Sequence, residues 1–175
     1  EGILLDPYGG RADIRAGRIR AVSQHFTDDP VRALRAARQA AEFGFTVEEE
    51  ALAYMHACAD ELQREPTERL MGELRRALAA PRPSVFFHVL READLLTVTF
   101  PEIAALEGQT QPTEFHPEGD ALAHTLAMVD AVAGETEDVK TRFAALVHDL
   151  GKGLTPKEML PHHYGHERTG LDALA

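Results

Sequence analysis

Six of the nine histidines lie between residues 116 and 166, with carboxylates among them. The adjacent pair His148-Asp149 follows His124 by one apolar segment, so two paired helices could bring the three side chains together. Mixed imidazole and carboxylate ligands suit Mn, Fe, Ni, Zn or Mg ions better than a thiolate-type zinc site does. A metal held there could activate water for attack on phosphorus, while Lys152 could neutralise phosphate charge. We therefore predict a metal site with catalytic roles for His148, Asp149 and Lys152.

A run of arginines follows an acidic pair near residue 30. Asp29-Pro30 is typical of a helix start, and Arg32, Arg35 and Arg38 repeat every three residues, which predicts one broad basic face. A capped, solvated amphipathic helix accounts for this pattern. Alternatively, a carboxylate acceptor and a guanidinium donor one turn apart could bind the edge of a base. Periodicity alone leaves both interpretations open.

Helices must position both groups, because helical periodicity runs through most of the chain after residue 29. A capping box at Thr46–Glu49 predicts the start of a second helix, and Gly44 is a natural end for the first. Pro66-Thr67 predicts the start of a third helix, with an apolar stripe on one face. The expected helices cover 30–43, 46–63, 66–80, 84–96, 121–133 and 137–150.

The two ends of the chain and one internal segment are expected to differ from this pattern. Residues 12–14 and 18–22 alternate like short strands around a turn at Gly17. Two or three such strands do not form a stable sheet alone, so we expect the chain to begin partway through a domain. The segment 107–120 is rich in Gly, Gln, Pro and Thr and predicts a domain boundary, and 151–175 is expected to be mainly loop. The predicted fold is all-α with a fragment of sheet at its front.

Composition limits the class of protein. The net charge of −11 argues against non-specific nucleic-acid binding, although all the basic residues before Lys140 are arginines, which suit local recognition of bases and phosphates. The single Cys58 excludes an internal disulfide and favours a reducing cytoplasm. No run approaches the roughly 20 apolar residues that span a bilayer, so we expect no membrane association. The isolated His25, His56 and His88 are interpreted as packing or surface residues.

The segment Asp28-Asp29-Pro30-Val31-Arg32 resembles the Asp/Glu-Asp-x-x-Arg motif of class II tRNA nucleotidyltransferases, the CCA-adding enzymes and their bacterial poly(A) polymerase relatives. In that family the second acid and the arginine select CTP or ATP, which by position implies Asp29 and Arg32, with Arg35 and Arg38 as further nucleotide-binding residues. The segment 68–74 resembles the family's Glu-Arg-x-x-x-Glu-Leu neck motif, which buttresses the nucleotide site. The segment 6–14 resembles the passage from the catalytic head into the neck.

The later histidines carry a second resemblance. The run 148–153, His-Asp-Leu-Gly-Lys-Gly, resembles the signature of HD-domain metal-dependent phosphohydrolases, and residues 116–126 resemble the HD domain fused behind many bacterial CCA-adding enzymes. The resemblance adds His166 to the ligands, giving His124, His148, Asp149 and His166. The family pattern ends with an Asp several tens of residues further on, so we expect the metal shell to be incomplete within this chain.

Together the two resemblances imply a division of the chain and of its functions. Residues 1–22 correspond to the end of the head, 23–80 to the neck, 81–115 to the body and 116–175 to the start of the HD domain. The implied substrates are ATP, CTP and tRNA. Mg²⁺ would serve nucleotidyl transfer, and Ni²⁺ or Mn²⁺ would serve the HD site. Because the family holds its two catalytic metals on an Asp-x-Asp pair that this sequence lacks, we expect no nucleotide addition by the chain alone.

Several alternatives remain at this stage. The motifs do not separate CCA-adding enzymes from A-adding, C-adding or poly(A)-adding relatives. The main activity could instead be hydrolysis of 2′,3′-cyclic phosphates, 2′-nucleotides or similar esters by the HD site. A third possibility is a non-catalytic RNA-binding module. The sequence does not distinguish a monomer from a dimer.

Overall fold

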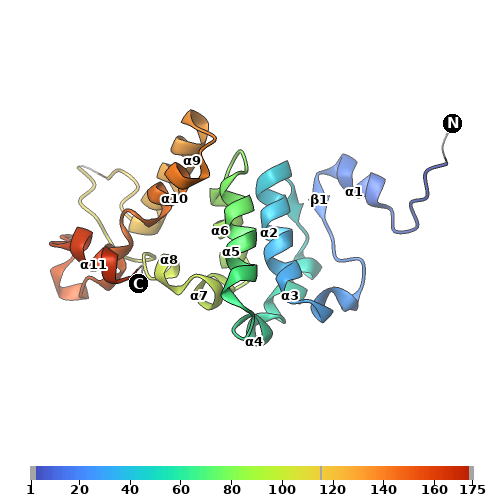
Figure 1. Ribbon diagram of the computed structural model, residues 1–175, viewed down its shortest axis with the longest axis horizontal. Coiled ribbons are helices and arrows are strands. Elements are labelled where there is room, and N and C mark those ends of the chain that lie inside the picture. Colours follow the sequence, from blue (N-terminus) through green and yellow to red (C-terminus); the bar gives the residue numbers. More distant parts are fainter. Residues whose placement is uncertain (1–2, 115, 174–175) are drawn as a thin grey trace.

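The computed structural model describes residues 3–114 and 116–173, and these residues are mostly helical. The helices follow one another along an elongated molecule, with α1 and β1 near one end and α9, α10 and α11 near the other (Figure 1). The only sheet within the described residues has two strands. No helix in the described ranges is long and apolar enough to cross a membrane. The predicted all-α class is confirmed.

The front of the chain differs from the predicted pair of strands. Residues 12–14 lie in a helix, α1 (Gly10–Ala16), whose first amides donate to the Asp6 carboxylate at 2.7 and 3.1 Å. Gly9 and Gly17 have φ values of 76° and 62°, so each end of this helix turns through the left-handed region that favours glycine. The prediction of a strand at 12–14 is therefore wrong, because a local carboxylate cap outweighs the short alternation of side chains.

A strand does form after Gly17, but it is short and has a distant partner. Strand β1 (Arg18–Ile19) pairs in parallel with β2 (Thr46–Val47), with Arg18 opposite Thr46. A 3₁₀ helix, η1 (Gln24–Asp28), then leads into the central helix. The capping box predicted at Thr46–Glu49 is wrong, because Thr46 belongs to β2 and no side chain caps the next helix.

Helix α2 (Val31–Phe43) is the centre of the first half of the molecule. It ends at Gly44, whose φ is 67°, as the sequence predicted. Its alanine-rich face lies against α5 (Thr67–Leu78) and α6 (Ser84–Glu92), and small side chains let these helices approach closely (Figure 1). The buried residues of this face are Val31, Ala33, Leu34, Ala36, Ala37, Ala40 and Ala41.

Two predicted helices are interrupted. The second is divided into α3 (Glu49–His56) and α4 (Ala59–Leu62), with the buried Cys58 between them. The fourth ends at Glu92, and Asp94 adopts a φ of 55° before the chain resumes as α7 (Leu96–Thr99) and α8 (Pro101–Ala104). A positive φ is uncommon for a non-glycine residue, but aspartate is among the residue types that adopt it most readily.

The second half contains two longer helices and a compact end. Helices α9 (Ala121–Glu135) and α10 (Val139–Val147) pack together, and Asp120 and Asp138 cap their first turns. Next come the 3₁₀ helices η2 (Leu150–Leu154) and η3 (Lys157–Met159) and then helix α11 (His166–Asp172). Sequence patterns missed α11, because only its packing on η2 stabilises so short a helix.

Two polar contacts fix the second half to the first. Arg142 of α10 is buried, and its Nη1 donates to the carbonyls of Leu78 and Ala80 at 2.7 and 2.9 Å. Asp130 of α9 accepts hydrogen bonds from the Ser84 amide and hydroxyl at 2.9 and 2.6 Å, at the start of α6. Helices α9 and α10 therefore have a defined place against α5 and α6. The domain boundary within 107–120 stays a prediction.

Candidate functional site

The fold brings the predicted metal-binding side chains together. His124 comes from α9, and His148 and Asp149 follow α10 directly. One ligand atom from each of the three lies within 4.8 Å of the others. His166, the first residue of α11, places Nε2 3.3 Å from Asp149 Oδ1. The packing of α9 on α10 is thus what assembles these residues, as the sequence predicted, and their role as metal ligands stays a prediction.

Asp149 is held as a buried carboxylate. Burial alone would raise its pKa, but contacts from His148 Nε2 at 3.1 Å and Lys152 Nζ at 2.6 Å outweigh burial and hold the pKa of Asp149 far below its usual range. The Asp149 carboxylate in turn raises the pKa of His148, against the opposing effect of burial. His148 Nδ1 lies 2.8 Å from the Ala145 carbonyl, which orients the ring. An ionised carboxylate and an oriented imidazole are the donors that a divalent cation requires.

Glu118 is a site residue that the sequence did not reveal. Its Oε2 lies 3.4 Å from His124 Nδ1, which leaves the Nε2 atom of that ring available for another partner. Its own backbone N–H, more than the nearby imidazoles, holds the pKa of Glu118 below the usual value, although burial opposes this. A carboxylate behind a ligating histidine orients the ring and raises its basicity. Glu118 precedes His124 by six positions, so loop closure creates this pair and no helical spacing indicated it.

Lys152 is less accessible than the predicted phosphate role suggests. It is buried, and its Nζ contacts Asp149 and the side-chain oxygen of Gln111. It does line a cavity of about 290 Å³, together with His116, His166 and the loop 161–165. A phosphate group could reach Lys152 through this cavity, and the role stays a prediction.

Gly151 controls the contact between η2 and α11. A Cβ atom at this position would lie 1.9 Å from the His166 carbonyl oxygen and 2.6 Å from the Gly170 nitrogen. Gly151→Ala is therefore expected to displace α11 and to lower the free energy of unfolding by about 1–3 kcal/mol, measured by urea denaturation. Gly134→Ala is the matched control, because a Cβ there meets nothing within 4 Å. Equal stability of the two variants would show that α11 does not need this close approach.

The predicted base-selecting pair lies where α2 begins. Asp29 has an extended backbone, and its Oδ1 accepts a hydrogen bond from the Val31 amide at 3.3 Å. The same oxygen accepts a bond from Arg69 Nη2 at 2.9 Å. Arg32 donates to the His25 carbonyl and lines a cavity of about 270 Å³ between η1 and the residues that follow β1. The structure thus fixes both side chains at one end of α2.

The other two arginines have different surroundings from Arg32. Arg35 is exposed, whereas Arg38 turns toward α5 and places its Nε 2.7 Å from Glu73 Oε2. Arg38 also pairs with Glu42 on its own helix. The predicted broad basic face is interrupted at Arg38, because its guanidinium pairs with the Glu73 and Glu42 carboxylates. Nucleotide binding by Arg35 and Arg38 stays a prediction, with the Arg38 guanidinium occupied by two carboxylates.

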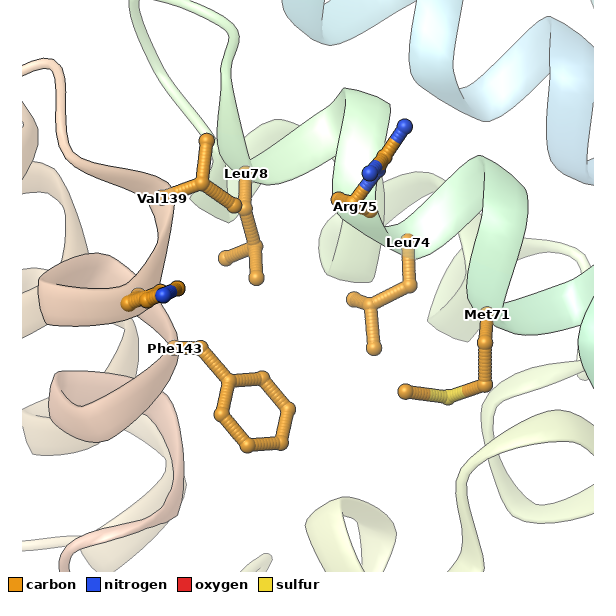
Figure 2. Close-up of a pocket in the computed structure, with 7 residues that line it drawn as sticks. Met71, Leu74, Arg75, Leu78, Val139 and Phe143 are labelled. Carbon is orange, nitrogen blue, oxygen red and sulfur yellow. The ribbon is translucent and has the colours of Figure 1, made fainter.

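A further cavity, of about 360 Å³, lies between α5 and α10 and is nearly all apolar. Leu74 and Leu78 of α5 point into it from one side, and Phe143 of α10 points into it from the other (Figure 2). Arg75 and Lys140 supply the only charged groups in its lining. Its lining contains no carboxylate, thiol or imidazole, so it offers no set of metal ligands.

Comparison with known proteins identifies the family. Residues 44–107 match the family model described as a probable RNA and SrmB-binding site of polymerase A. The multifunctional CCA protein of Shewanella denitrificans is 49% identical over 176 residues, covering 98% of this chain and 43% of that protein. The chain belongs to the multifunctional CCA protein family. The corresponding protein of Nitrosococcus oceani gives the same identity over 173 residues and the same coverage.

This membership confirms the family that the neck motifs predicted. The chain spans about 43% of the length of the multifunctional CCA proteins it matches. A solved structure named tRNA-processing enzyme (apo form I) superposes with a TM-score of 0.60 at 21% identity, covering 99% of this chain and 47% of that one. A complex of CCA-adding enzyme with ATP gives 0.60 at 22% identity, covering 96% and 39%. Both similarities show that the helical arrangement is shared.

Proposed function

We propose that this chain supplies the nucleotide-selecting neck of a tRNA nucleotidyltransferase that adds C and A to tRNA 3′ ends. One observation carries the proposal. The two segments that resemble the family's neck motifs contact each other through the Arg69–Asp29 ion pair, and Glu73 of the second motif also pairs with Arg38, further along α2. In this arrangement Asp29 offers an acceptor and Arg32 a donor at the same helix end, as recognition of a base edge requires.

Arg69 would act on the base through Asp29. Its guanidinium also pairs with Glu65 at 2.7 Å, and the two carboxylates raise the pKa of Arg69 above its usual value. A guanidinium held between two acids has a defined position, so it orients the Asp29 carboxylate without itself facing a nucleotide. Asp29 would therefore select the base, and Arg69 would keep its oxygen atoms aligned.

This assignment also implies how the chain divides into domains. Residues 1–22 would be the end of a catalytic head, 23–80 the neck, 81–115 the body and 116–175 the first part of an HD domain. ATP, CTP and tRNA would be the substrates, in a reducing cytoplasm. The Mg²⁺ ions of nucleotidyl transfer would belong to a head with an Asp-x-Asp pair, so the 175 residues alone are expected not to transfer nucleotides.

A chimeric enzyme tests the proposal. Residues 1–175 would replace the matching segment of the multifunctional CCA protein of Shewanella denitrificans, and addition to a tRNA lacking its 3′ end would be measured. We expect the chimera to add nucleotides, and replacement of both Asp29 and Arg32 by Ala to slow incorporation at least about tenfold, because template contacts to the base are lost. The control replaces Asp60 and Arg64, two exposed residues of the same types. Equal rates in both double variants would contradict the proposal.

A second function is favoured by the convergence of His124, His148 and Asp149. We propose that these residues, with His166, hold a divalent ion such as Ni²⁺ or Mn²⁺ in an HD-type phosphohydrolase site. The donors fit such an ion, because Asp149 is ionised and two imidazoles face it. When bound, the ion would lower the pKa of a coordinated water molecule and so supply a nucleophile.

Other residues around this site would bind the substrate and orient Asp149. The 290 Å³ cavity lined by Lys152 lies beside Asp149 and has room for a phosphate ester. Lys152 would neutralise the phosphate, and His166 would keep the Asp149 carboxylate oriented. Cyclic 2′,3′-phosphates and 2′-nucleotides are the proposed ester substrates.

A further inference from the structure

One imidazole nitrogen beside the candidate metal ligands is buried and unpaired. His116 Nδ1 is shielded from solvent and has no hydrogen-bond partner among the described residues. The ring of His116 stands edge to face against that of His124, with the centroids 4.6 Å apart. Buried polar atoms in folded proteins nearly always have a partner, so an unpaired one indicates a bound water molecule, ion or ligand.

The loop that precedes α9 positions His116 beside His124. Two hydrogen bonds join the ends of this loop: the Gln111 amide donates to the Gly119 carbonyl at 3.0 Å, and the Gly108 amide donates to Asp120 at 2.7 Å. The Ala121 amide donates to the Gln109 carbonyl at 2.9 Å, so the loop returns directly to the first turn of α9. His116 is therefore placed by a closed loop against His124, one turn into the helix.

His124 belongs to two clusters of possible ligands. One contains His116 and Glu118, the other contains His148 and Asp149, and the ligand atoms within each cluster lie within 4.8 Å of one another. Glu118 already engages Nδ1 of His124 at 3.4 Å, so only Nε2 of that ring is available to a cation. The two clusters share His124, and among the described residues no such group unites His116 with His148 or Asp149. An ion at His124 Nε2 would therefore hold His148 and Asp149 and draw the His116 ring toward it, while Glu118 stays on Nδ1 of His124.

We propose that His116 is a further ligand of the divalent ion, beside His124, His148, Asp149 and His166, and that Glu118 is a positioning residue that orients His124. The inference rests on the proposed metal-dependent function. Four imidazoles and one carboxylate suit Co²⁺, Ni²⁺, Zn²⁺ or Mn²⁺, and they would give the ion five ligands from this chain. The partner of the unpaired His116 nitrogen would then be the metal.

Co²⁺ is the probe of choice, because its visible absorption reports the number and kind of its ligands. The 175-residue chain and its His116→Ala variant would be titrated with Co²⁺ and followed by calorimetry and absorption. We expect the variant to bind Co²⁺ about 10- to 100-fold more weakly, with a changed spectrum, and free imidazole to restore the parent spectrum. Glu118→Gln is expected to weaken binding about tenfold while the spectrum keeps its shape. His88→Ala is the control, because this exposed histidine lies on α6 and belongs to neither cluster of possible ligands.

The outcomes separate the inference from the function on which it rests. If the His116→Ala variant binds Co²⁺ with the parent affinity and spectrum while His148→Ala loses the ion, His116 is no ligand and the metal site stands. If the parent chain binds no Co²⁺, both are overturned. Thermal melting of each variant shows whether a loss of binding reflects a loss of fold, and rescue by imidazole occurs only if the rest of the site is intact.

Discussion

His148→Ala is expected to abolish metal binding, so that the content of Mn²⁺ or Ni²⁺ after gel filtration falls from about one ion per chain to near zero. His148 is one of three residues whose ligand atoms converge within 4.8 Å, and its Nε2 faces Asp149 Oδ2 at 3.1 Å. Loss of this imidazole leaves too few donors around the ion. Elemental analysis of the purified protein measures the content directly.

The control for this measurement is an exposed histidine on another helix, and His88→Ala serves because the side chain lies at the surface of α6. That variant is expected to keep the metal content of the parent. Folding of the His148→Ala variant is checked by circular dichroism, since Asp149 retains its contact with Lys152 at 2.6 Å. Stoichiometric metal in a folded His148→Ala protein would show that the ligand set is wrong.

Arg142→Met is expected to lower the free energy of unfolding by about 3–5 kcal/mol, because a buried charged donor joins the ends of two helices. Arg142 donates to the carbonyls of Leu78 and Ala80 at the end of α5 and to those of Ala133 and Thr136 at the end of α9, at 2.7, 2.9, 3.0 and 2.8 Å. Methionine fills much of the same volume but provides no donor. The four carbonyls would then lose their partner, and the two halves of the molecule would separate more easily.

Urea denaturation measures this effect. Arg64→Met is the matched control, because Arg64 is exposed and its replacement is expected to change the free energy of unfolding by less than about 0.5 kcal/mol. A small effect at both positions would mean that water replaces the Arg142 donors and that packing alone holds α10 to α5.

Local signals in the sequence predicted the helices that have strong boundaries. Helix α2 begins after Asp29-Pro30 and ends at Gly44, and α5 begins after Pro66, where residue type alone restricts the backbone. The sequence failed where a distant partner decides the structure. Thr46 resembles a helix cap, but the pairing of β2 with β1 places it in a strand. The short helix α11 depends in the same way on its packing against η2.

The candidate sites show the same limit. His124, His148 and Asp149 could be predicted because two consecutive helices with a short connection must pack side by side. Glu118 could not, since its contact with His124 depends on the closure of the loop before α9. Arg38 has the same residue type and spacing as Arg32 and Arg35. Its guanidinium, however, pairs with the buried Glu73 on α5, a partner that the sequence does not indicate.

The base preference of the chimeric enzyme tests most directly whether Asp29 and Arg32 form the template. Each of the four nucleoside triphosphates would be offered singly to the chimera and to its Asp29→Ala, Arg32→Ala double variant, with a tRNA acceptor lacking the 3′ end. The parent chimera is expected to incorporate C and A and to exclude U and G, and the double variant is expected to lose at least about tenfold of that discrimination. A double variant that discriminates as well as the parent would contradict the assignment.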